Sequence, residues 1–65
     1  MYKNRIKEYR KKSGLTIREL ADKSHVSVGY ICHLEKGKRI NPSTEVMEDI
    51  ARALNKSIAE IFFSE

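Results

Sequence analysis

The sequence predicts an all-α fold, a compact domain of five short helices, and three observations carry this prediction. Apolar residues recur every three or four positions through most of the chain, which is the period of an amphipathic helix. Serine or threonine stands in front of the later apolar segments, as expected of helix N-caps. No stretch alternates apolar and polar residues in the way a half-buried strand does. The 65 residues leave room for a single domain, residues 1–65.

The first predicted helix is basic on one side and partly apolar on the other. Its inward stripe is formed by Tyr2, Ile6, Tyr9 and Ser13. Lys and Arg residues fill the opposite face. Gly14 is expected to end the helix, because glycine freely adopts the left-handed conformation found at helix C-termini.

Two helices joined by a tight corner follow, at about residues 17–24 and 28–36. Thr16 is the expected N-cap of the first, and Glu19 three residues later completes a capping box. Ser27 ends the corner as the N-cap of the second helix. The second helix leaves small and polar side chains on its outward face, which favours contact with a partner.

Two more helices complete the chain. Pro42 keeps the basic loop before it out of helical geometry, and Ser43 starts the fourth helix. The buried stripe of that helix is predicted to comprise Val46, Met47, Ile50, Ala51 and Leu54. Ser57 and Glu60 form a second capping box. The last helix is expected to turn three residues inward: Ile58, Ile61 and Phe62.

Charge is distributed unevenly along the chain. The net charge is +4, but residues 1–39 hold eleven basic and four acidic side chains, whereas residues 40–65 hold two basic and five acidic ones. A local +7 beside a local −3 favours a polyanionic partner on one side of the molecule. An ordinary solvated surface is the alternative explanation of the same pattern.

Several classes of protein are not expected. One cysteine cannot form an internal disulfide, which suits a reducing, cytoplasmic location. No signal peptide or membrane-spanning stretch is predicted. The chain has no set of nucleophile, base and orienting residue and no phosphate-binding glycine loop, so we do not expect an enzyme. No cofactor, metal or small-molecule ligand is expected either.

A set of residues in fixed order resembles the phage-repressor-like (Xre-type, lambda-repressor-like) helix-turn-helix family. The set comprises Leu20-Ala21, Val26-Ser27, Ile31, Leu34-Glu35-x-Gly37, Pro42 and Ile50-Ala51-x-Ala53-Leu54. The resemblance runs from about Ile6 to Phe62. It implies a five-helix repressor-type domain whose 28–36 helix enters the major groove of double-stranded DNA. It also implies transcriptional regulation, usually repression, by a homodimer on a near-palindromic operator.

The sequence departs from the family at His25, where the family most often has glycine. Histidine tolerates a positive φ better than most residues, so we interpret His25 as slightly strained within the same fold. A pH sensor or metal ligand is the sharper alternative, but no plausible ligand set accompanies this residue.

The resemblance also implies which residues contact DNA. Carried over by position, the base-contacting residues are Ser27, Val28, Gly29 and His33. Serine and histidine can hydrogen-bond base edges, and valine can contact a thymine methyl group. An unspecialised exposed helix face is the alternative.

Phosphate contacts are expected from the free N–H groups at the second helix start and from flanking basic or polar side chains. The predicted set is Arg10, Thr16, Ile17, Tyr30, Lys36, Lys38, Arg39 and Asn41. A core role for the Tyr30 ring is equally open. The family also pairs Arg10 with Glu35, the alternative being that both are solvated. Cys32 is interpreted as a small residue on the DNA side.

The C-terminal part of the chain has more apolar residues than the core of a monomer is expected to bury. The predicted dimer interface is Ile40, Ile58, Phe62 and Phe63. The leading hypothesis is a sequence-specific DNA-binding regulator without enzymatic activity. A protein-interaction module on the same fold, such as an antitoxin-like partner binder, is the alternative from another functional class.

Overall fold

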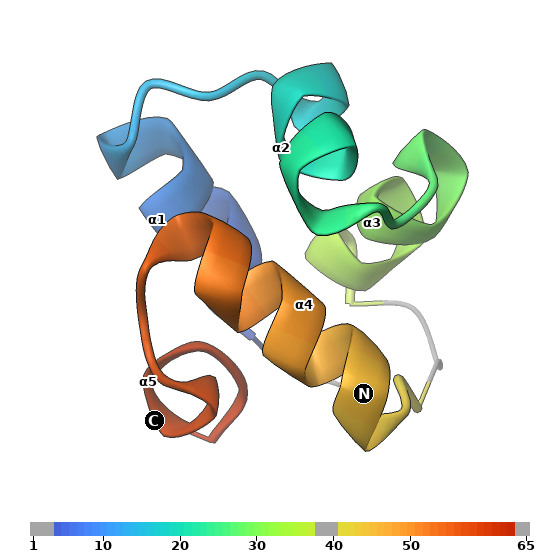
Figure 1. Ribbon diagram of the computed structural model, residues 1–65, viewed down its shortest axis with the longest axis vertical. Coiled ribbons are helices and arrows are strands. Elements are labelled where there is room, and N and C mark those ends of the chain that lie inside the picture. The colour runs from blue at the N-terminus through green and yellow to red at the C-terminus, as the bar shows by residue number, and fades with distance from the viewer. Residues whose placement is uncertain (1–3, 38–40, 64–65) are drawn as a thin grey trace.

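The computed structural model describes residues 4–37 and 41–63. Within these ranges the chain forms five helices and no strand, so the predicted all-α class is confirmed (Figure 1). The helices are α1 (Ile6–Lys12), α2 (Ile17–Ser24), α3 (Val28–Glu35), α4 (Thr44–Leu54) and α5 (Ile58–Phe62).

The helix starts are fixed by the capping residues that the sequence predicted. Thr16 Oγ1 accepts the Glu19 N–H at 3.0 Å, and Glu19 Oε1 accepts the Thr16 N–H at 2.8 Å. Ser57 and Glu60 repeat this capping box at the start of α5, with distances of 3.1 and 2.9 Å. Each box satisfies two backbone donors that have no partner inside the helix, so α2 and α5 begin where the sequence placed them.

The helix ends differ slightly from the predicted ones. α1 stops at Lys12, and Gly14 adopts the predicted left-handed conformation with φ of 72°. The predicted 28–36 helix stops at Glu35, because the left-handed Gly37 (φ 71°) follows directly after the capping Lys36. Tyr2, predicted on the inward stripe of the first helix, lies outside the described residues.

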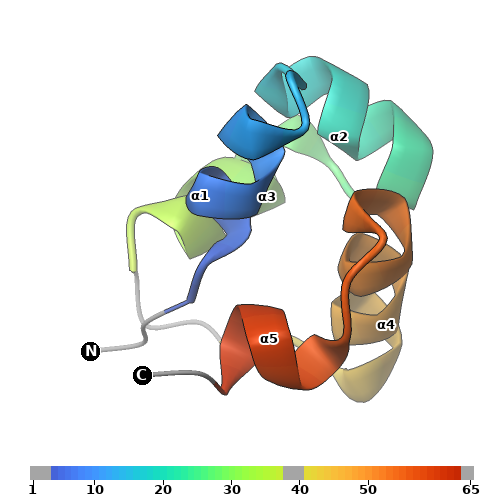
Figure 2. The same ribbon diagram turned by 90° about the vertical axis from the view of Figure 1, so that its left-hand side faces the viewer.

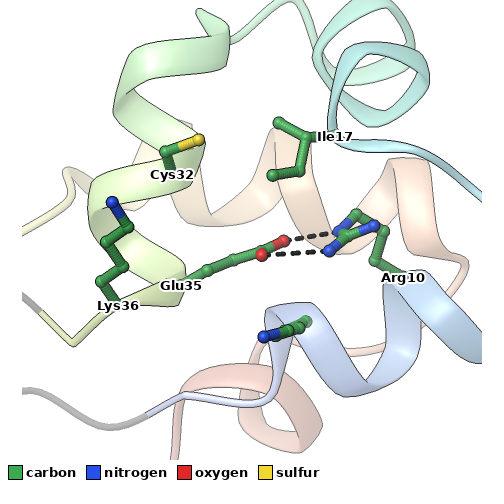
Figure 3. Close-up of a pocket in the computed structure, with 6 residues that line it drawn as sticks. Arg10, Ile17, Cys32, Glu35 and Lys36 are labelled. Carbon is green, nitrogen blue, oxygen red and sulfur yellow. Dashed lines mark hydrogen bonds and ion pairs between the residues drawn. The ribbon is translucent and has the colours of Figure 1, made fainter.

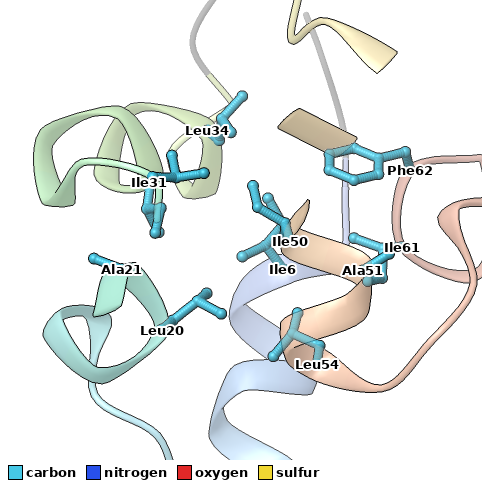
Figure 4. Packing of buried hydrophobic residues seen from close by; sticks show 11 residues of the cluster. Ile6, Leu20, Ala21, Ile31, Leu34, Ile50, Ala51, Leu54, Ile61 and Phe62 are labelled. Carbon is cyan, nitrogen blue, oxygen red and sulfur yellow. The ribbon is translucent and has the colours of Figure 1, made fainter. Parts of the chain in front are cut away.

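The core is formed by apolar side chains from all five helices. Its fully buried members are Ile6, Leu20, Ile31, Leu34, Ile50 and Ile61, and Figure 4 shows them converging on α4. Ile31 and Leu34 fix the inner face of α3. Because residues three and four apart share a helix face, Val28, Gly29 and His33 are left on the exposed side of α3.

α3 packs against two other helices, α2 and α1. α2 packs against both α3 and α4, while α1 packs against α3, α4 and α5. Figures 1 and 2 show α2 toward the top of the molecule and α5 below α1. One end of α3 is therefore joined to α2 by the corner, and its other end crosses α1.

Candidate nucleic-acid interface

The corner between α2 and α3 is held by a buried hydroxyl and a left-handed residue. Ser24 Oγ donates to the Leu20 carbonyl at 2.7 Å and accepts the Val26 N–H at 3.3 Å. His25 has φ of 60° and ψ of 27°, which turns the chain sharply, and Val26 is buried beneath it. Ser27 Oγ then accepts the Tyr30 N–H at 3.2 Å, starting α3 in a fixed direction.

The predicted base-contacting residues lie together on the exposed side of α3. Ser27, Val28, Gly29 and His33 are all exposed, and Val28 is 44% exposed although it is apolar. A Cβ added at Gly29 would have no atom within 4 Å, so packing inside the chain does not require a glycine there. The first turn of α3 is thus an open, nearly uncharged surface.

Arg10 and Glu35 form a tight bidentate pair between α1 and α3. Arg10 Nε lies 2.6 Å from Glu35 Oε2, and its Nη2 lies 3.2 Å from Oε1 (Figure 3). Nη1 donates to the Leu15 carbonyl at 2.9 Å, next to the start of α2. The hydrogen bonds to Glu35 raise the pKa of Arg10. The two side chains are only 10% and 6% exposed, so the geometry is not that of two solvated surface charges.

A pocket of about 270 Å³ opens beside this pair. It is lined by Lys7, Arg10, Ile17, Cys32, Glu35 and Lys36, and Figure 3 shows it between α1, α3 and the start of α2. Three cations face one carboxylate there, and that carboxylate is already bonded to Arg10. Lys7 was not among the predicted contacts. Its spacing of three residues from Arg10, on the same helix face, is the signal that could have identified it.

The start of α2 offers different donors from those predicted. The Thr16 N–H is occupied by Glu19, which corrects the expectation that it is free. Among the described residues, the N–H groups of Ile17 and Arg18 have no hydrogen-bond partner. Arg18 was not among the predicted contacts. The capping box satisfies the N–H groups of Thr16 and Glu19 only, so the N–H of Arg18 remains free, as the sequence pattern could have indicated.

The other predicted phosphate contacts are only partly placed. Lys36 and Asn41 are exposed, and Tyr30 is half-buried against the core. Lys38 and Arg39 lie outside the described residues. Of the predicted contacts in and around the basic loop after α3, the structure therefore describes Lys36 before it and Asn41 at its end.

The predicted dimer residues do not form one exposed set. Phe63 is 65% exposed and Ile58 is half-buried. Phe62 is only 5% exposed, because its ring packs into the protomer's own core (Figure 4). Phe62 is thus corrected to a core residue, and Ile40 lies outside the described residues.

The described residues contain no group of three or more His, Cys, Asp and Glu side chains placed to hold a metal ion. None of their helices is both long and apolar enough to cross a membrane.

Comparison with known proteins gives a consistent result. A relative from Archaeoglobus fulgidus, described as an uncharacterized HTH-type transcriptional regulator, is 45% identical over 60 residues, covering 92% of this chain and 84% of the relative. The HTH-type transcriptional regulator SinR of Bacillus subtilis is 36% identical over 58 residues, covering 89% of this chain. The chain spans about half the length of SinR, 52%.

The fold is similar to a solved structure as well. The crystal structure of the clp gene regulator ClgR from Corynebacterium glutamicum matches with a TM-score of 0.75 and 41% identity. The match covers 83% of this chain and 56% of that one. A family model described as helix-turn-helix matches residues 6–61, from the first residue of α1 into α5. On its motif, its five-helix fold and these matches, the chain belongs to the helix-turn-helix family of the Xre type.

Proposed function

We propose that this domain is a sequence-specific DNA-binding transcriptional regulator that acts as a repressor by occupying its operator as a dimer. The observation that carries the proposal is the division of α3 into two faces. Ile31 and Leu34 lock one face into the core, while Ser27, Val28, Gly29 and His33 leave the other exposed. A rigidly held helix with an open first turn has the geometry that major-groove recognition requires.

The exposed residues have the chemistry to distinguish bases. Ser27 and His33 can form hydrogen bonds with base edges, and Val28 can contact the methyl group of thymine. Gly29 lets the helix backbone approach closely, since nothing in the chain itself requires a glycine at that position. These four residues supply the sequence preference of the proposed regulator.

Phosphate contacts hold the domain on DNA independently of sequence. The free N–H groups of Ile17 and Arg18 point out of a helix N-terminus, which attracts anions. Lys7 and Lys36 line the adjoining pocket, and Arg10 keeps two of its five N–H donors unused beyond its bonds to Glu35 and Leu15. Tyr30, Lys38, Arg39 and Asn41 remain proposed phosphate contacts, whereas Thr16 does not, because its N–H is bonded to Glu19.

A two-fold dimer is proposed to form through the C-terminal helix. Phe63 is a large apolar side chain that the protomer leaves exposed, and half-buried Ile58 lies at the start of the same short helix. Phe62 no longer belongs to the set, while Ile40 remains part of the proposal. Two α3 helices related by such an axis would bind half-sites about 34 Å apart, one turn of DNA.

The decisive experiment is selection from a randomised DNA duplex library with the wild-type chain, followed by gel shift in rising salt. We expect an enriched sequence with two inverted half-sites about 10 base pairs apart. Affinity should fall steeply with salt, because phosphate contacts release counterions. No enrichment, together with weak binding to every duplex, would show that α3 does not recognise DNA sequence.

The dimer has its own test. Sedimentation of the wild-type chain with the selected duplex should show two chains per duplex, and Phe63→Ser should reduce this to one. Phe63 is exposed, so the substitution leaves the fold intact and the change reports on association. A single wild-type chain per duplex would contradict the dimer while leaving the DNA-binding proposal standing.

A further inference from the structure

Asn4 joins the start of α1 to the end of α3. Its side-chain Nδ2 donates to the Leu34 carbonyl at 2.8 Å, across 30 residues of sequence. Its Oδ1 accepts the Ile6 N–H at 3.1 Å. The N-cap residue of α1, Arg5, makes no side-chain cap, so Asn4 caps α1 with one end of its amide and contacts α3 with the other.

The segment that carries Asn4 is itself anchored. The Arg5 N–H donates to the Ile61 carbonyl at 2.8 Å, which fastens this part of the chain to α5. Ile6 follows directly and is fully buried. The two residues that follow Asn4 are therefore anchored, Arg5 to α5 and Ile6 in the core, and they hold Asn4 beside the end of α3.

A second contact from α1 reaches the neighbouring residue of α3. Arg10 binds Glu35 in bidentate fashion, one residue beyond the Leu34 carbonyl. Asn4 lies two residues before α1, and Arg10 lies in the second turn of that helix. Ile31 and Leu34 fix the inner face of α3 in the core, and the two attachments add separate restraints on the C-terminal end of α3.

We propose that Asn4 is a positioning residue for the recognition helix, setting the angle at which α3 presents its exposed face to DNA. The inference rests on the proposed function of α3. Val28 lies six residues from Leu34, so a tilt of about 5° at the attached end moves the first turn by about 0.8 Å. Contacts that discriminate partners need placement to about 0.5 Å. A change at Asn4 therefore acts on base discrimination without touching DNA.

Two variants separate this role from simple capping. Asn4→Ser keeps a hydroxyl that can cap α1 but is too short to reach the Leu34 carbonyl. Asn4→Asp keeps an acceptor for the Ile6 N–H and loses the donor. Ser43→Ala is the matched control, since it removes the helix cap of α4 and leaves both attachments of α3 and the Arg5–Ile61 hydrogen bond in place.

The measurement is the ratio of dissociation constants for a scrambled duplex and for the duplex that the wild-type chain selects from a randomised library. Both Asn4 variants should lower this ratio by about three- to tenfold, the value of one hydrogen bond, mainly through weaker binding to the selected site. Ser43→Ala should lower the melting temperature and leave the ratio unchanged. The carbonyl ¹³C shift of Leu34 should move in the Asn4 variants and not in the control.

The opposite results are equally definite. An unchanged ratio in folded Asn4 variants overturns the positioning role, as does an equal loss in Ser43→Ala. If the variants do not fold, the wild-type chain decides: its Asn4 side-chain amide protons must show scalar coupling to the Leu34 carbonyl carbon, and absence of that coupling overturns the inference. If the wild-type chain selects no sequence, the proposed function fails and the inference with it. If the wild-type chain selects a sequence and the Asn4 variants keep its ratio of dissociation constants, the proposed function stands and only the positioning role of Asn4 is overturned.

Discussion

Arg10 shows how one side chain can organise three parts of a small domain. Its guanidinium binds Glu35 on α3 and the Leu15 carbonyl before α2, while its backbone belongs to α1. Burial of two charges is costly, and the bidentate geometry offsets that cost only while both partners are present. The pair therefore matters most for what happens when one member is removed.

Glu35→Ala is expected to destabilise the domain by about 1–3 kcal/mol, because it leaves a largely buried guanidinium without its carboxylate. Urea unfolding followed by circular dichroism measures this directly. Glu8→Ala is the comparison, since its ion pairs with Arg5 and Lys12 are half-exposed and should contribute little. A loss below about 0.5 kcal/mol for Glu35→Ala would mean that solvent screens the pair.

His25 adopts a backbone conformation that is uncommon for a residue other than glycine. Its φ of 60° is left-handed, and the side chain is exposed. His25→Gly should stabilise the domain by about 0.5–1 kcal/mol, since glycine adopts this conformation without strain. Asn55, with φ of 58°, is the matched site, and Asn55→Gly should gain less because asparagine tolerates this region. A lower melting temperature for His25→Gly would reveal a structural partner of the imidazole.

Among the helices, α5 depends most on its cap, because it has only five residues. Hydrogen bonds from the Ser57 backbone and side chain lower the pKa of Glu60 below its ordinary value near 4.5. A carboxyl group whose pKa is lowered by folding stabilises the folded state above its unfolded pKa. That contribution is lost as the pH falls through the folded pKa.

Stability should consequently fall between about pH 5 and about pH 3, and Glu60→Gln should show a smaller part of that fall. Thermal melts at several pH values provide the measurement. The quantity to compare is the slope of melting temperature against pH, measured for the wild-type chain and for Glu60→Gln. Other carboxyl groups titrate in both proteins, so only the difference between the two slopes reports on Glu60. Parallel curves would show that the cap does not depend on the charge of Glu60.

Gly29 lies within α3, although glycine is a poor helix former and lowers the stability of the helix. Gly29→Ala should stabilise the domain by about 0.5–1 kcal/mol, because alanine is the better helix former and the added methyl group meets nothing within 4 Å. The same methyl group should weaken binding to the selected duplex if the helix lies close to the bases. Gly14→Ala provides the contrast, since its φ of 72° makes alanine unfavourable there. Unchanged DNA affinity for Gly29→Ala would remove this residue from the proposed contact surface.

For the whole domain, the residues by themselves predicted what depends on local chemistry. The capping boxes at Thr16 and Ser57 follow from neighbouring residues, whereas the left-handed His25 and the Arg10–Glu35 pair were expected from the family resemblance.

Contacts between distant parts of the chain are harder to predict. Asn4 and Leu34 are joined across 30 residues, which no local pattern reveals. The helical period placed Phe62 inward, as the structure shows, but Phe62 was also assigned to the dimer interface, which its burial contradicts.

The proposed interface separates residues that hold DNA from residues that distinguish its sequence, and one comparison tests this division. Lys36 is exposed at the end of α3 and lines the pocket beside the Arg10–Glu35 pair. Because we propose it as a phosphate contact, Lys36→Gln should weaken binding to selected and scrambled duplexes alike and reduce by about one the slope of log affinity against log salt concentration. His33 is exposed in the last turn of α3, and we propose that it hydrogen-bonds a base edge.

His33→Ala should cost about 1–3 kcal/mol of binding free energy at the selected site and very little on scrambled DNA. Competition binding on a randomised site, with wild type and both variants, shows whether base preference or only affinity changes. If both variants lose affinity uniformly and keep the wild-type base preference, His33 is not a base-contacting residue. The outward face of α3 would then hold DNA without distinguishing its sequence, because the residue best able to hydrogen-bond a base edge would have no effect on selectivity.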